Sequence, residues 1–223
     1  MTPALLSLTL SISLVATAPE APKKTGGSVA LAAQRMQAFY EKSHDLTVHF
    51  QQTFVNPAFH KTLHSEGRLA FEKPGMIRFD YTSPEPKLFV VKGDRIVSYI
   101  PAAQQAMEGS FKADQLSASV TFLWGRGHLE SEFRIAAADR KDLAPGIALE
   151  LTPRHPDPRF QRIFFVVDPK SFAVKESLVV DGAGDENRFD FSDLRPDAGL
   201  SPKDFDFTPP PGTQIVKLDG QPR

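Results

Sequence analysis

The chain has 223 residues, 41% of them hydrophobic, a length that suits one sizeable β domain as well as two small domains. Its 26 basic and 27 acidic residues are mixed along the chain, and the formal net charge of −1 predicts no general attraction to nucleic acid or acidic membranes. The absence of Cys excludes disulfides, thiolate metal sites, a cysteine nucleophile and a lipid-modified cysteine.

The amino-terminal residues resemble a secretory signal peptide. An uncharged apolar run over residues 4–15 precedes the small residues 16–18, Ala-Thr-Ala, as at a cleavage site. This run is shorter than the ~20 apolar residues that a membrane span needs. We therefore expect residues 1–18 to be a signal peptide, residues 19–28 to be a flexible leader rich in Pro, Gly and charge, and residues 29–220 to form one exported domain.

One helix and a series of strands are predicted for the body of the chain. Residues 29–42 carry Leu31, Met36 and Phe39 at helical spacing, which predicts an amphipathic helix. From Leu46 onward apolar residues alternate with polar ones, as in a half-buried strand. Further strands are predicted at residues 68–73, 76–81, 87–91, 95–100, 133–136, 147–152, 162–167, 174–180, 187–192 and 206–208, about eleven strands in all.

The alternation lapses between residues 110 and 129. Apolar side chains there recur at helical intervals, namely Leu116, Val120, Leu123 and Trp124, before a Gly-Arg-Gly sequence ends the run. This pattern predicts a second helical element.

Several predicted strands are apolar on both faces, for example residues 88–91 and 163–167. Both faces of such strands must be covered, and the 18 Phe residues, against three Tyr and one Trp, also need a dry environment. A strongly curved sheet with helices or a ligand inside the curve would satisfy this requirement. A closed barrel or a two-sheet sandwich would satisfy it as well, so periodicity leaves the three architectures open.

Residues with the spacing of a catalytic or metal site are scarce. Among the six His residues, only His60 and His64 have a spacing that suggests a metal, and they flank a predicted hairpin after Pro57. The Gly-rich acidic stretch 181–187 departs from a calcium-loop pattern and is interpreted as a turn. With no nucleophile elbow, Walker A loop or complete dinucleotide fingerprint, we expect no enzyme activity, metal or cofactor.

Several ordered segments match those of a known family. They are an early Phe-Gln-Gln at residues 50–52, a second hairpin at residues 67–74 and 78–84, Gly93, the stretch from Tyr99 to Gln105, and a closing Phe-Asp-Phe-Thr-Pro-Pro-Pro-Gly at residues 205–212. In this order and spacing, over residues 36–218, the chain resembles the LolA-type outer-membrane lipoprotein carrier family of Gram-negative bacteria.

The resemblance implies a mainly β (α+β) fold, an incomplete antiparallel β-barrel with an N-terminal helix and a helical lid. It also implies a monomeric periplasmic carrier that binds lipoprotein acyl chains in a hydrophobic cavity. Its partners would be acylated lipoproteins, an inner-membrane lipoprotein-release ABC transporter and an outer-membrane lipoprotein acceptor, and no nucleic acid.

Site residues follow from the same resemblance. The expected cavity wall includes Phe50, Phe54, Leu69, Phe71, Ile77, Phe79, Phe89 and Val91, and the expected lid carries Leu116, Val120, Leu123 and Trp124. In the family a basic residue before the second-hairpin Pro, often Arg, holds the lid closed. Here that residue is Lys73, which lacks the planar donor fork of Arg, and Arg78 is the second candidate for the latch.

Three alternative functions stay open. The first is a periplasmic lipid-binding module of the same fold, or a sensor of mislocalised lipoproteins. The second is the outer-membrane acceptor of the same pathway, which a lipidated Cys normally anchors, and the lack of Cys argues against it. The third, a β-barrel hydrolase, would need a convergent catalytic cluster.

Overall fold

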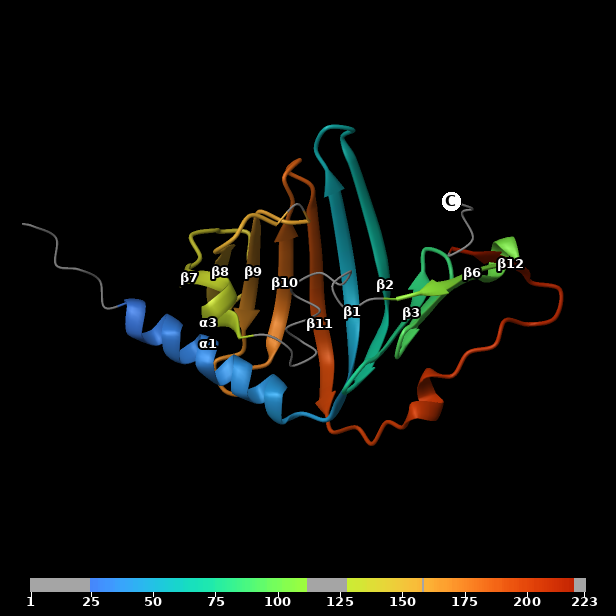
Figure 1. Ribbon diagram of the computed structural model, residues 1–223. Coiled ribbons are helices and arrows are strands. Elements are labelled where there is room, and N and C mark those ends of the chain that lie inside the picture. The colour runs from blue at the N-terminus through green and yellow to red at the C-terminus, as the bar shows by residue number, and fades with distance from the viewer. Residues whose placement is uncertain (1–24, 112–127, 158, 219–223) are drawn as a thin grey trace, which may run out of the picture.

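The computed structural model describes residues 25–111, 128–157 and 159–218, and these residues form mainly β-structure (Figure 1). The helices are α1 (Thr25–Lys42) and α3 (Leu129–Glu132), with short 3-10 turns η1 (Pro101–Ala103) and η3 (Pro202–Phe205). The strands are β1 (Asp45–Asn56), β2 (Lys61–Glu72), β3 (Met76–Ser83), β4 (Lys87–Lys92), β5 (Arg95–Ile100), β6 (Gln105–Ser110), β7 (Phe133–Ala137), β8 (Ile147–Pro153), β9 (Arg162–Val167), β10 (Val174–Val180), β11 (Glu186–Pro196) and β12 (Gln214–Lys217).

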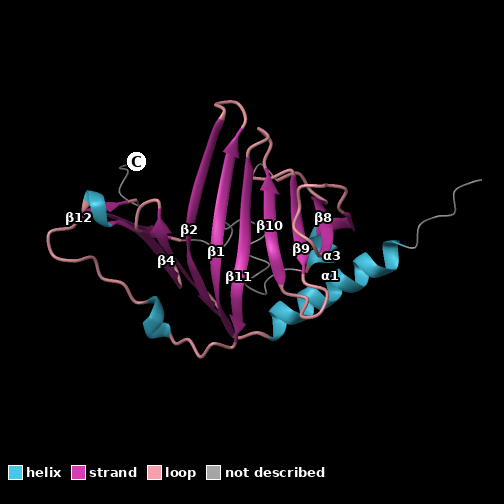
Figure 2. Ribbon diagram, turned by 180° about the vertical axis from the view of Figure 1, so that it is seen from behind, coloured by secondary structure: helices cyan, strands magenta, loops and turns pink. Residues whose placement is uncertain are grey.

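All of these strands belong to one 12-stranded sheet, in the order β12-β6-β5-β4-β3-β2-β1-β11-β10-β9-β8-β7. Two meanders, β1 to β6 and β7 to β11, join where β1 pairs with β11, and Figure 2 shows them as one continuous sheet. Every pairing is antiparallel except that of β12 with β6. The described strands therefore form an open sheet, which confirms the predicted incomplete barrel. Among the described residues the sheet has twelve strands, whereas about eleven were predicted.

The sheet is strongly curved. Phe79 on β3 and Phe189 on β11 are separated by β2 and β1, so in a flat sheet with ~4.8 Å between strands they would lie roughly 14 Å apart. Their ring centroids are 6.5 Å apart. The face that carries these rings, called the inner face below, is therefore concave.

Helix α1 packs on this inner face through Val29, Ala32, Ala33, Met36 and Tyr40, which belong to the same core cluster as Leu46 and Val48 of β1. The predicted amphipathic helix is confirmed, but it begins at Thr25, four residues before the predicted start at Val29. Gly26 and Gly27 have low helix propensity, and the packing of the following turns outweighs that preference. No helix in the described ranges is long and apolar enough to cross a membrane.

The predicted strands differ from the structure in several places. Strand β2 begins at Lys61, seven residues before the predicted start at residue 68. Strands β6 and β12 were not predicted, and residues 206–208 are not a strand. The β6 sequence, Gln-Ala-Met-Glu-Gly-Ser, has little β-propensity, and its pairing with β5 decides its conformation. Phe205 and Phe207 instead pack on the convex outer face against Ala70, Leu88 and Val90.

The predicted second helical element falls almost entirely on residues 112–127, which lie outside the described ranges, and so do Leu116, Val120, Leu123 and Trp124. Ser110, at the start of the predicted element, closes β6, and after the gap the chain continues with the single turn α3.

Candidate ligand-binding face

Six aromatic side chains converge on the inner face and are called the aromatic floor below. They are Phe50, Phe79, Tyr81, Phe89, Phe189 and Phe191. The ring centroid of Phe50 lies 5.8 Å from that of Phe79, 5.1 Å from that of Tyr81 and 5.6 Å from that of Phe189, each in an edge-on arrangement. Phe50 is buried at the centre, and the other five rings are half-buried. The floor thus offers apolar surface that is not fully used by the protein's own packing.

Strand register brings the floor together. Phe50 lies opposite Phe191 of β11 and opposite Gly67 of β2. A Cβ at Gly67 would lie 2.2 Å from the carbonyl oxygen of Asp80 and 2.9 Å from Cζ of Phe50. Gly67 therefore permits the β2–β3 backbones and the Phe50 ring to approach more closely than any side chain would allow.

Packing tightens toward α1. Around the carboxyl end of α1, the space bounded by Tyr40, Leu46, Val48, Leu69, Phe71, Phe191 and Leu194 leaves a void of only about 10 Å³. Along β1 the burial then falls from Leu46, 1% exposed, to Phe54, which is half-buried. The packing between the end of α1 and the sheet thus leaves no room for a ligand, and the inner face becomes more open toward the β1–β2 hairpin.

Polar side chains interrupt the apolar surface at the hairpin end. Nε2 of Gln52 donates a hydrogen bond to Oδ1 of Asn187 over 2.9 Å, and Nδ2 of Asn56 donates to Oδ2 of Asp185 over 2.9 Å. Gln52 has the same strand parity as Phe50 and Phe54, so it lies between them on the inner face. A ligand with an apolar part and a polar head would meet both kinds of surface here.

The structure brings the predicted wall residues to one face. Five of them are buried in the inner core cluster, namely Phe50, Leu69, Phe71, Ile77 and Val91, and Phe79 and Phe89 are half-buried against it. Phe54 shares their side of β1 by strand alternation. Sequence reasoning did not assign Tyr81, Phe189 or Phe191 to the wall. The period of two in Arg188-Phe189-Asp190-Phe191 was the signal that could have placed the last two.

The two latch candidates lie on different parts of the molecule. Nζ of Lys73 donates hydrogen bonds to the backbone carbonyls of Tyr40 and Glu41 at the end of α1. Arg78 points to the outer face, where Nε lies 2.8 Å from Oδ2 of Asp80 and Nη1 donates to the carbonyl of Asp204 over 3.2 Å. Lys73 thus contacts a helix on the inner face, while Arg78 holds the C-terminal segment.

Titratable groups do not form a catalytic or metal cluster in the described residues. No three His, Asp or Glu side chains there are grouped so as to hold a metal ion. His60 lies in the hairpin turn, and Nδ1 of His64 lies 3.2 Å from Oγ1 of Thr53. Burial raises the pKa of Tyr81 and keeps its phenol neutral on the floor. The inner face is thus suited to contact with an apolar molecule.

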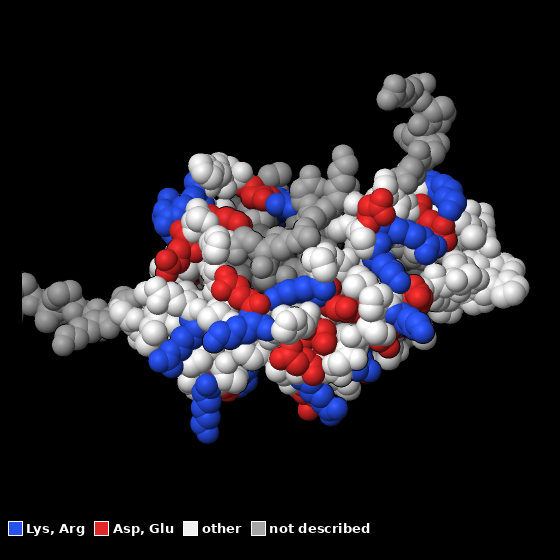
Figure 3. All heavy atoms as spheres, turned by 60° about the horizontal axis from the view of Figure 1, so that its bottom comes forward, with Lys and Arg blue, Asp and Glu red and all other residues white. Residues whose placement is uncertain are grey.

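Side chains of both charges lie near one another on one face of the molecule (Figure 3). Acidic and basic side chains of the described residues are interspersed on the face shown in Figure 3. Two open grooves, of about 400 and 480 Å³, flank α1, and their linings include Gln34, Glu130 and Arg154. These grooves have mixed polar and apolar linings, whereas the aromatic floor is apolar apart from the phenol of Tyr81.

Residues 41–208 match the sequence profile of the family described as "Outer membrane lipoprotein carrier protein LolA". This match covers most of the chain. The chain therefore belongs to the LolA family.

Curated relatives carry the same description. An "Outer-membrane lipoprotein carrier protein" of Bordetella avium (strain 197N) is 28% identical over 221 residues, which cover 98% of this chain and 100% of the relative. Another from Methylibium petroleiphilum is 31% identical over 168 residues, which cover 75% of this chain and 80% of the relative.

Among solved structures, an "uncharacterized conserved protein" from Thermus thermophilus matches with a TM-score of 0.54 at 13% identity, covering 85% of this chain and 99% of that one. At this identity the match supports the fold alone.

Proposed function

We propose that this protein is a periplasmic carrier that binds lipoprotein acyl chains on the aromatic floor and carries lipoproteins from the inner to the outer membrane. Residues 1–18 would direct its export. The observation that supports this function most directly is the convergence of six aromatic side chains on one concave face, with five of them only half-buried. Membership in the LolA family gives the cargo class.

Energetics favour partial burial of the cargo. Transfer of acyl chains from water stabilises the complex by ~0.8 kcal/mol per methylene, so ~30 fully buried methylenes would exceed the ~20 kcal/mol limit of non-covalent affinity. A carrier that also has to release its cargo needs an affinity well below this limit. A shallow floor with half-buried rings provides apolar contact without full enclosure.

The proposed carrier would exchange its cargo with two partners. An inner-membrane lipoprotein-release ABC transporter would load the protein, and an outer-membrane lipoprotein acceptor would receive the cargo. The apolar side chains Leu116, Val120, Leu123 and Trp124 would form a lid that competes with acyl chains for the same surface. Lys73 would act in this cycle through α1, because its ammonium group binds the end of that helix.

A matched pair of Phe variants tests the proposal. Phe79 is half-buried on the inner face, and Phe207 is half-buried on the outer face. Phe79→Ser should lower the affinity for an acylated lipoprotein roughly tenfold because apolar contact is lost, whereas Phe207→Ser should leave it unchanged. Phe71 is a poor choice, since it is 3% exposed and Phe71→Glu would unfold the core.

The measurement is extraction of lipoprotein from inner-membrane vesicles that contain the release complex, with thermal unfolding as the check on folding. Equal extraction by the wild type, Phe79→Ser and Phe207→Ser would exclude the aromatic floor as the binding site. A protein that binds acyl chains yet neither takes up nor delivers lipoproteins would instead match the lipid-binding or sensor alternative.

A further inference from the structure

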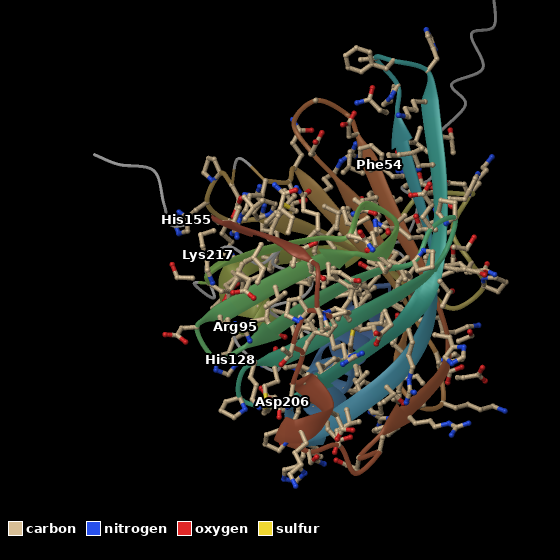
Figure 4. The ribbon with its side chains drawn as sticks, turned by 90° about the vertical axis from the view of Figure 1, so that its right-hand side faces the viewer. Phe54, Arg95, His128, His155, Asp206 and Lys217 are labelled. Carbon is tan, nitrogen blue, oxygen red and sulfur yellow. The ribbon has the colours of Figure 1, made fainter. Side chains whose placement is uncertain are left out.

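The hairpin between β1 and β2 extends beyond the rest of the sheet. Each of the two strands has 12 residues, and they pair along their whole length from Asp45–Glu72 to Asn56–Lys61. In Figure 1 this hairpin projects further than the neighbouring β10–β11 turn, and Figure 4 shows Phe54 below its end. Residues 57–64, Pro-Ala-Phe-His-Lys-Thr-Leu-His, are called the hairpin tip below.

The tip presents a large aromatic side chain to solvent. Phe59 is 80% exposed, and Leu63 is 46% exposed. The turn that holds Phe59 is hydrogen-bonded, because its backbone N–H donates to Oδ1 of Asn56 over 2.8 Å and the N–H of His60 donates to the carbonyl of Pro57 over 3.2 Å. The turn thus holds Phe59 in a defined position, and Phe59 has the highest exposed fraction among the large hydrophobic side chains of the described residues.

The tip carries apolar side chains on the same face of the sheet as the aromatic floor. Leu63 lies opposite Phe54, and both have the strand parity of the inner face. On this face Phe54 and Leu63 lie between the floor and the turn that carries Phe59, and the polar Gln52 lies between Phe50 and Phe54. The burial of β1 decreases toward this turn, from Phe50, 2% exposed, to its half-buried end.

The charge of the tip differs from the chain average. Residues 57–64 contain Lys61 and two His and no acidic residue. On the adjacent β10–β11 turn, the carboxylate of Asp185 accepts from Asn56, and that of Glu186 pairs with Arg140 over 2.9 Å. Glu186 is thus paired with a cation, whereas Asp185 keeps its negative charge because Asn56 is neutral. Within the tip itself, Lys61 gives a formal charge of +1, although the whole chain is close to neutral.

We propose that the hairpin tip inserts Phe59 and Leu63 into the interfacial layer of an anionic phospholipid bilayer. An aromatic ring beside a basic residue suits the boundary between headgroups and acyl chains. A narrow two-stranded ribbon with one Phe and one Leu offers far less than the ~800 Å² per partner of a stable protein interface. This inference rests on the proposed carrier function, in which the tip would bring the open end of the floor to the membrane, so that acyl chains pass along Phe54 and Leu63.

Vesicle binding of the full chain tests the inference. The probes are vesicles of phosphatidylethanolamine and phosphatidylglycerol, compared with phosphatidylcholine vesicles. The wild type should sediment with the anionic vesicles, and the double variant Phe59→Ser/Leu63→Ser should bind roughly tenfold more weakly because apolar contact is lost. The control is Leu31→Ser on α1, since Leu31 is 46% exposed, as Leu63 is, and it should bind like the wild type. Lys61→Gln should weaken binding and reduce its salt dependence.

A site-specific label gives a second measurement. Because the sequence has no Cys, Ala58→Cys provides one position for an environment-sensitive dye, and its emission should shift to the blue with anionic vesicles. Gly182→Cys on the β10–β11 turn is the control, since it lies in open space and should not shift.

The outcomes separate this inference from the carrier function. If the wild type binds acylated lipoprotein in solution but does not sediment with vesicles, or if the tip variant sediments like the wild type, the membrane contact is excluded and the carrier function stands. A tip variant that binds vesicles normally but fails only with the release complex would point to a protein contact and would also overturn the inference. If the wild type binds no acylated lipoprotein, the carrier function fails, whatever the vesicles show.

Discussion

The ammonium group of Lys73, just after β2, donates a hydrogen bond to the backbone carbonyl of Glu41 in the last turn of α1, over 3.1 Å. It also donates to the carbonyl of Tyr40. The last carbonyls of a helix lack intrahelical partners and carry partial negative charge, so a cation there caps the helix. On the other side, the Tyr40 hydroxyl accepts the N–H of Val174 over 3.0 Å. The end of α1 is thereby tied to both meanders of the sheet.

Replacing Lys73 should loosen this end of α1. Lys73→Met removes both hydrogen bonds and should lower the free energy of unfolding by about 1–2 kcal/mol, whereas Lys73→Arg should lose less because it keeps the charge. Urea unfolding, together with amide exchange in residues 36–42, measures the effect. Lys170→Met on an exposed turn is the control, and equal effects of the two Met variants would show that Lys73 does not hold the helix.

Tyr40→Phe isolates the second attachment of α1. The ring would still fill its buried site, but the buried N–H of Val174 would lose an acceptor, which should cost about 1–3 kcal/mol of unfolding free energy. Tyr99→Phe is the matched control, since its ring packs on Phe207 and should need no hydroxyl for that contact. If Tyr40→Phe unfolds at the same urea concentration as the wild type, the hydroxyl contributes nothing to the docking of α1.

Gly67→Ala should disturb the aromatic floor. A methyl group 2.2 Å from the Asp80 carbonyl oxygen forces β2 and β3 apart, and we expect a loss of about 2 kcal/mol or more. Gly182→Ala, where a Cβ meets nothing within 4 Å, should be nearly neutral. Thermal unfolding of both variants provides the comparison. A Gly67→Ala protein as stable as Gly182→Ala would mean that the strands separate without cost.

Stability in acid should depend on Asp142. Its carboxylate lies 2.7 Å from Nη2 of Arg140 and 2.6 Å from Nη2 of Arg188, on the outer face. The hydrogen bond from Arg140 is the main cause that lowers the pKa of Asp142 from the usual 3.8 to about 2. Because the pKa is lower in the folded state, the stabilisation is complete above about pH 4 and is lost as the pH falls toward 2.

The variant Asp142→Asn should therefore be less stable than the wild type at neutral pH, and most of the difference should disappear as the pH falls from about 4 toward 2. Urea unfolding at a series of pH values between 7 and 2 measures this convergence. A difference that stays constant over the whole series would mean that the ionisation of Asp142 does not contribute.

The local sequence pattern was sufficient to predict most of the secondary structure and the family of this protein. Alternating apolar residues predicted most of the strands, helical spacing predicted α1, and ordered segments such as residues 205–212 predicted the family, which the match over residues 41–208 confirms. Within a single strand, the period of two also predicted which residues share a face, such as Phe50 and Phe54 of β1, because alternation is a local property of the chain.

Other features depended on long-range pairing and curvature. The open sheet, the strands β6 and β12, and the contact of Arg78 with the carbonyl of Asp204 follow from which strands pair and how far the sheet bends, and a stretch of a few residues does not encode these. The same holds for the 6.5 Å between Phe79 and Phe189, 110 positions apart in the sequence. The sequence by itself thus determined which side chains could share a face, and only the tertiary structure decided that this face is concave and that its rings meet.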